Sequence, residues 1–157
     1  MNQALEHVAR DIGLDLPAHA RLRFAFALAC AERVRHLLED ARVLACLDGL
    51  GAWLRGESSD AQLQALAIEA ATLANRHPGS RSLDGVGHAA VSASYAVAKA
   101  LAGQALAAAD YAAYAVVYAQ GGAPAVAEPA AFSTEFQWQA RCLADLATSE
   151  TPWEPSQ

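Results

Sequence analysis

The stretch from residue 83 to residue 120 restricts the fold more than any other feature, because its pattern is helical almost throughout. It is dominated by Ala, the strongest helix former, which makes up about a quarter of the chain. A single helix of this length would measure about 57 Å, whereas a domain of this size is only about 40 Å across. The run must therefore break, and Gly103 is the residue best suited to the break. We expect one helix at 83–101 and a second at 105–120.

Apolar residues at helical spacing predict the other helices. The expected ranges are a short helix at 3–12 and longer ones at 18–39, 41–55, 60–75 and 134–147. The last helix is expected to bury Phe136, Ala140, Leu143 and Leu146 or Ala147. Val, Ile and Thr, which strands prefer, are sparse. The sequence predicts an all-α, single-domain, Ala-rich bundle of about five main helices with no sheet. The domain should cover 1–148, with 1–16 weakly ordered, and 149–157 should form a flexible tail.

Capping signals support several of these helix limits. Gly56 should end its helix in the left-handed conformation. Ser59 and Gln62 have the spacing of a capping box, and Thr134 with Gln137 is expected to form a second one. Residues 121–129, which are rich in Gly and Pro, are expected to form a loop.

Charge and cysteine content exclude several classes of protein. The net charge is −6, which disfavours nucleic acid as a partner, and the excess of acidic over basic residues is largest in the C-terminal half, where residues 83–157 hold seven acidic and two basic side chains. There is neither an export signal at residues 1–14 nor an apolar run long enough to span a membrane, so we expect a cytoplasmic protein without membrane contact. The three cysteines are far apart and contain no CxxC motif, which is typical of buried thiols in a reducing compartment.

Candidate chemistry is sparse. His88 shares a helix face with Asp84, Ser92 and Tyr95, but a serine inside a helix lacks the strain and the oxyanion hole that a nucleophile needs. We therefore expect His88 to be a half-buried, hydrogen-bonded core residue. Glu32, His36 and Glu39 lie one turn apart, which fits an exposed ion pair better than a metal site. The sequence predicts no catalytic residue, no cofactor and no bound metal.

Tyr111, Tyr114 and Tyr118 form a stripe at helical spacing that suits either a helix–helix seam or a protein interface. Ala90, Ser94, Ala98 and Ala102 form a second stripe of small residues, which allows a neighbouring helix to approach closely. That stripe also leaves self-association into a homo-oligomer open.

Several segments, in this order, resemble the Imm-five-like immunity proteins of bacterial polymorphic toxin systems. They are RLRFAFALACAERVRHLLE at 21–39, LGAWLRGE at 50–57, GHAAVSASYAVAKALAGQAL at 87–106, ADYAAYAV at 109–116 and EFQWQARCLADL at 135–146. The resemblance implies an all-helical protein that binds a toxin. This chain departs from the family at one position. The Ala-rich region of the family carries a second Gly-His pair, whereas here Gly103 is followed by Gln104.

The resemblance and the charge pattern together suggest a protein that binds and neutralises a cognate toxin by occluding it. An acidic surface would steer a basic toxin towards the complex. The candidate partner-binding residues are Asp84, Asp110, Tyr114, Tyr118, Glu128 and Glu135. The alternatives are a small helical enzyme or ligand-binding bundle with a pocket near His88, and a scaffold that self-associates through its Ala stripes.

Overall fold

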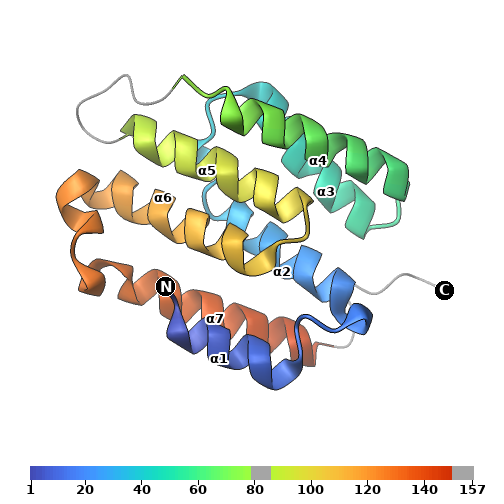
Figure 1. The fold of residues 1–157 in the computed structure, drawn as a ribbon, viewed down its shortest axis with the longest axis horizontal. Coiled ribbons are helices and arrows are strands. Elements are labelled where there is room, and N and C mark those ends of the chain that lie inside the picture. The colour runs from blue at the N-terminus through green and yellow to red at the C-terminus, as the bar shows by residue number, and fades with distance from the viewer. Residues whose placement is uncertain (79–85, 150–157) are drawn as a thin grey trace.

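The computed structural model describes residues 1–78 and 86–149. Over these residues the only regular secondary structure is helical, and turns and short loops connect the helices (Figure 1). Its α-helices are α1 (Gln3–Ile12), α2 (Ala20–Glu32), α3 (Ala41–Leu54), α4 (Asp60–Asn75), α5 (Val86–Leu101), α6 (Ala105–Val126) and α7 (Ser133–Thr148). Short 3₁₀ helices lie at η1 (Pro17–His19), η2 (Arg35–Leu37) and η3 (Pro129–Phe132). The all-α prediction is confirmed, but the expected five main helices are too few, since the described residues form seven α-helices.

The helices pack in layers around a central pair, α5 and α6 (Figure 1). Helix α4 packs against α5 on one side, with α3 beside it, and α1 packs against α7 on the other side. Helix α2 contacts α3, α5, α6 and α7, so it joins the two sides and occupies the centre of the core. Phe26 on α2 is completely buried there.

Gly103 separates α5 from α6, as the sequence predicts. Its φ of 73° is in the left-handed region, where residues with a side chain are strained. A Cβ atom at this position would lie 2.9 Å from the Phe24 ring. The turn therefore requires glycine for two reasons, backbone conformation and close packing.

Small side chains let the central helices approach one another. On the core side of α6, Ala108, Ala109 and Ala112 are all fully buried. On α5, Ser94 is 2% exposed and donates its hydroxyl proton to the carbonyl oxygen of Ala90 at 3.0 Å. Three of the four residues in the small-residue stripe of α5, namely Ala90, Ser94 and Ala98, are thus buried within the monomer.

The predicted helix ends are partly confirmed. Gly56 has a φ of 78°, and Ser59 with Gln62 forms the complete capping box. The second capping box is wrong, because η3 leads directly into α7 and places Thr134 and Gln137 inside the helix. The expected loop at 121–129 is also largely helical, since α6 continues to Val126 through a kink at Gly122.

Residues 3–12 form the short helix predicted there, and α1 is tied firmly to α7. The amide of Asn2 donates hydrogen bonds to the Phe136 carbonyl oxygen at 3.0 Å and to Gln139 Oε1 at 3.1 Å. Gln139 in turn donates to the carbonyl oxygen of Ala109 at 2.8 Å, so one buried amide joins α1, α6 and α7. The domain limits, 1–148 with a tail at 149–157, stay a prediction, and residues 150–157 lie outside the described residues.

Candidate partner-binding site

Three of the six predicted partner-binding residues are exposed on the surface. They are Asp110 and Tyr114 on α6 and Glu128 just before η3. Tyr118 is partly buried. Asp84 lies outside the described residues. The expectation that Glu135 reaches solvent is wrong, since this residue is only 3% exposed.

Two tyrosines of α6, Tyr114 and Tyr118, belong to a longer row of aromatic rings. His88 stacks on Tyr118 with ring centres 5.3 Å apart, and Tyr118 lies 5.1 Å from Tyr114. The row continues from Tyr114 to Phe132 at 5.9 Å and from Phe132 to Phe136 at 5.3 Å. The row thus crosses four elements, α5, α6, η3 and α7, and Tyr114 at its middle is 40% exposed.

A cleft of about 390 Å³ opens beside this row. We call it the aromatic cleft; its lining residues are Met1, Asp110, Tyr114, Val126, Pro129, Phe132 and Phe136. The sequence did not identify Phe132 and Phe136 as residues that line a cleft. Residues 121–129 were expected to form a loop, and Phe136 was expected to lie in the core. The available signal was Pro129, whose fixed φ suits the first turn of a helix that carries Phe132 back towards Tyr114.

Asp110 is the charged side chain of the aromatic cleft. Burial against its neighbours raises the pKa of this carboxyl, the nearby ammonium group of Met1 lowers it, and Glu6 raises it further. Among the described residues, Asp110 makes no hydrogen bond and no ion pair with another side chain. Its carboxylate is therefore poorly hydrated, although the residue as a whole is exposed.

His88 does not occupy the position expected for it. The residue is exposed and lies against Tyr118, so the expectation of a half-buried core histidine is wrong. Tyr95, which the sequence places on the same helix face, stacks on Tyr111 with ring centres 5.2 Å apart. The Tyr95 hydroxyl donates to Asn75 Oδ1 at 2.9 Å, and this bond directs it towards α4.

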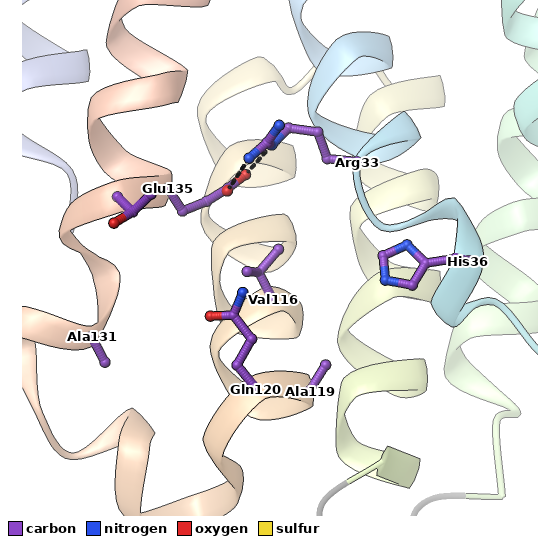
Figure 2. A pocket seen from close by; sticks show the side chains of 8 residues that line it. Arg33, His36, Val116, Ala119, Gln120, Ala131 and Glu135 are labelled. Atoms are coloured by element: carbon purple, nitrogen blue, oxygen red, sulfur yellow. Dashed lines mark hydrogen bonds and ion pairs between the residues drawn. The ribbon is translucent and has the colours of Figure 1, made fainter.

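Glu135 forms a clamp between α2 and α7. Arg33 Nε and Nη2 each donate to one oxygen of the Glu135 carboxylate at 2.7 Å (Figure 2). The Arg33 guanidinium also lies 3.9 Å from the centre of the Trp138 ring, and the paired carboxylate raises the pKa of Arg33. Both carboxylate oxygens are engaged inside the protein, so Glu135 holds the scaffold together and does not face a partner.

A polar cavity of about 380 Å³ lies next to this clamp (Figure 2). Besides Arg33 and Glu135, its polar lining comes from His36, Gln120 and Thr134. The ion pair expected among Glu32, His36 and Glu39 is wrong, because Glu32 pairs with Arg35 at 3.5 Å and Glu39 lies 3.8 Å from His77, while His36 borders the cavity. The described residues contain no group of three or more side chains placed to hold a metal ion.

The cysteines are free thiols in the described structure, and two of them are buried. Burial raises the pKa of Cys30 far above the usual value for a thiol and raises that of Cys46 to about 11. A thiol protonated at neutral pH is a poor nucleophile, so neither residue is suited to thiol chemistry.

Comparison with known proteins gives one match. The model of the family described as Imm-5 like putative immunity protein matches residues 16–146, which is most of the chain. Neither a curated protein nor a solved structure matches. In the described part of the chain, no helix is long and apolar enough to cross a membrane. The matched region begins before α2 and ends within α7, so it contains the helical core, the aromatic row and the Arg33–Glu135 clamp, and the chain belongs to the Imm-5 like family.

Proposed function

We propose that this protein is a bacterial cytoplasmic immunity protein that binds a cognate protein toxin and blocks the toxin's active site. The family description supports a role in immunity. The observation that assigns binding to a particular surface is the exposure of Tyr114, which lines the aromatic cleft together with Asp110. Exposed aromatic residues next to a pocket are typical of the residues that dominate binding energy in protein interfaces.

The proposed interface comprises Asp110, Tyr114, Tyr118 and Glu128. Many toxins that act on nucleic acid have basic clefts, and the net charge of −6 would attract such a surface over a distance. Tyr114 would then anchor the complex, while Glu128, which is exposed, would act mainly on the association rate. Glu135 takes no direct part, since its carboxylate is occupied by Arg33.

This mechanism needs no chemical step by the immunity protein. A rigid helical surface seated over the toxin's active site excludes substrate by volume alone, so we propose that the chain is not an enzyme and uses no cofactor. The alternative of an enzyme or ligand-binding bundle around His88 loses its main argument, because His88 is exposed and packs against Tyr118.

The test uses the cognate toxin domain, which is sought in the reading frames next to this gene. Binding of the purified domain is measured for the wild type, for Tyr114→Ala and for Tyr111→Ala. Tyr111 is the matched control, because it is an exposed tyrosine on the same helix but does not line the aromatic cleft. We expect Tyr114→Ala to weaken binding by about 2 kcal/mol, or roughly 30-fold, and Tyr111→Ala to change it little.

Two results would contradict the proposal. Absence of binding, together with failure of the co-expressed chain to protect cells from that toxin, would argue against the immunity function. Equal weakening by the two tyrosine variants would leave the immunity function in place but move the interface away from the aromatic cleft.

A further inference from the structure

We propose that the aromatic cleft is a receptor for one arginine side chain of the partner protein, with the guanidinium stacked on Tyr114 or Phe132 and paired with the carboxylate of Asp110. This inference rests on the proposed function and deepens it, because it names the chemical group that the toxin presents to this surface.

The shape of the cleft fits one long side chain. Its volume of about 390 Å³ lies near the lower end of the range for pockets that hold small ligands. Its walls come from four separate segments, namely Met1 before α1, α6, η3 and the start of α7, and the rings of Tyr114, Phe132 and Phe136 follow one another along it. Flat aromatic walls suit a flexible apolar stem that ends in a planar head.

The charge of the cleft favours a cationic head, and the ammonium group of Met1 offsets only part of the Asp110 charge, since the pKa of this carboxyl stays raised. Asp110 is the one acidic residue among the cleft's lining residues in the described chain, and no other described side chain pairs with it. Neighbouring atoms displace part of the water around its carboxylate, which raises the pKa of this group, so a cation that approaches it gains more than it would beside a fully hydrated acid. A neutral apolar side chain would displace more water from this carboxylate without adding a positive charge, which is unfavourable.

Arginine fits this combination of groups better than lysine does. A guanidinium is planar, so it can stack on an aromatic ring and at the same time direct two N–H donors at a carboxylate. It is also more weakly hydrated than an ammonium group and loses less when it leaves water. The protein already uses the same arrangement internally, since Arg33 pairs with Glu135 through two hydrogen bonds while lying over Trp138.

The experiment needs no toxin, because the probe is a capped Ala-Arg-Ala tripeptide. The matched probe is Ala-citrulline-Ala, since citrulline has nearly the same shape as arginine but no charge. Each is titrated into the full chain to about 50 mM while the ring signals of Tyr114, Phe132 and Tyr111 are followed by NMR. We expect saturable shifts of Tyr114 and Phe132 with the arginine peptide, and binding at least ~5-fold weaker with citrulline, as for a desolvated cation–π and ion-pair contact.

Two variants separate the cleft from general attraction by an acidic protein. Asp110→Asn keeps the size of the side chain and should remove the preference for arginine over citrulline. Asp145→Asn removes the same charge from an exposed position near the far end of α7 and should leave that preference intact. Folding of both variants is verified from the ring signals of the fully buried Phe26.

The inference is overturned if the arginine peptide causes no saturable shift, if citrulline binds equally well, or if both variants lose the preference equally. Each of these results concerns only the cleft, and binding of the toxin domain is measured separately. Retained toxin binding with no arginine preference would therefore reject this inference and keep the proposed function.

Discussion

Replacing Glu135 by Gln tests whether the clamp between α2 and α7 stabilises the fold. The two hydrogen bonds from Arg33 are 2.7 Å long, and the exposed fraction of the Glu135 side chain is 4%. A net hydrogen bond to a charged group contributes about 1.5–3 kcal/mol. Gln keeps one acceptor, and solvent reaches the Arg33 side chain, which is 36% exposed, so part of the loss is recovered. We expect the free energy of unfolding to fall by about 2 kcal/mol.

Thermal unfolding followed by far-ultraviolet circular dichroism measures this loss. In a domain of this size, 1 kcal/mol changes the Tm by about 2–4 °C, so Glu135→Gln should lower it by roughly 4–8 °C. Asp48→Asn is the matched control, because Asp48 also accepts two hydrogen bonds from an arginine, Arg35, but its side chain is 60% exposed. This control should leave the Tm nearly unchanged, since solvent screens exposed pairs.

A double-mutant cycle then assigns the effect to the pair. Combining Glu135→Gln with Arg33→Gln should cost much less than the sum of the two single changes, because the second change removes an interaction that is already broken. A Tm for Glu135→Gln within about 1 °C of the wild type would refute the reasoning. Strict additivity in the cycle would show that the two residues do not act as a pair.

Three further predictions concern the scaffold. Gly103→Ala should lower the free energy of unfolding in urea by about 1–2 kcal/mol, because the φ of residue 103 is 73° and the new Cβ would press on Phe24. An unchanged stability would mean that the turn rearranges freely. Ser59→Ala should lower the free energy of unfolding by about 1 kcal/mol in the same assay, because it removes the hydrogen bond that the backbone N–H of Gln62 donates to the Ser59 hydroxyl. Equal stability would mean that water replaces the cap. The reactivity of Cys46 towards a thiol reagent in the native protein should rise only as the pH approaches about 11, because burial keeps the thiol protonated up to that pH. Rapid labelling of native Cys46 at pH 8, measured by mass spectrometry, would contradict the raised pKa.

Local signals in the sequence predicted those parts of the fold that depend on neighbouring residues. The break at Gly103, the cap at Gly56 and the capping box at Ser59 each follow from a few adjacent residues, and the structure has all three. The prediction of a loop at 121–129 was wrong. Gly and Pro residues usually end helices, whereas here α6 kinks at Gly122 and continues to Val126.

Features that depend on distant partners could not be predicted in this way. The helical pattern turned Phe136 and Ala140 of α7 towards the core, but the structure buries Glu135 and Gln139 together with Leu143. Polar side chains can face inward only where partners satisfy them, and the partner of Glu135, Arg33, lies 102 positions earlier in the chain. The aromatic cleft could not be predicted for the same reason, since only tertiary packing brings Tyr114 and Phe132 together.

The buried amide of Gln139 has a consequence for synthesis on the ribosome. Asn2 is synthesised 137 residues before Gln139, its partner on α7. At ordinary elongation rates of about 5–20 residues per second, α1 waits roughly 7–27 s for the surface that covers Leu5. The nascent chain therefore exposes the apolar face of α1, with Leu5 and Ala9, until α7 leaves the exit tunnel. A chain truncated before α7 should be a substrate for chaperones and proteases even though α2–α6 are complete.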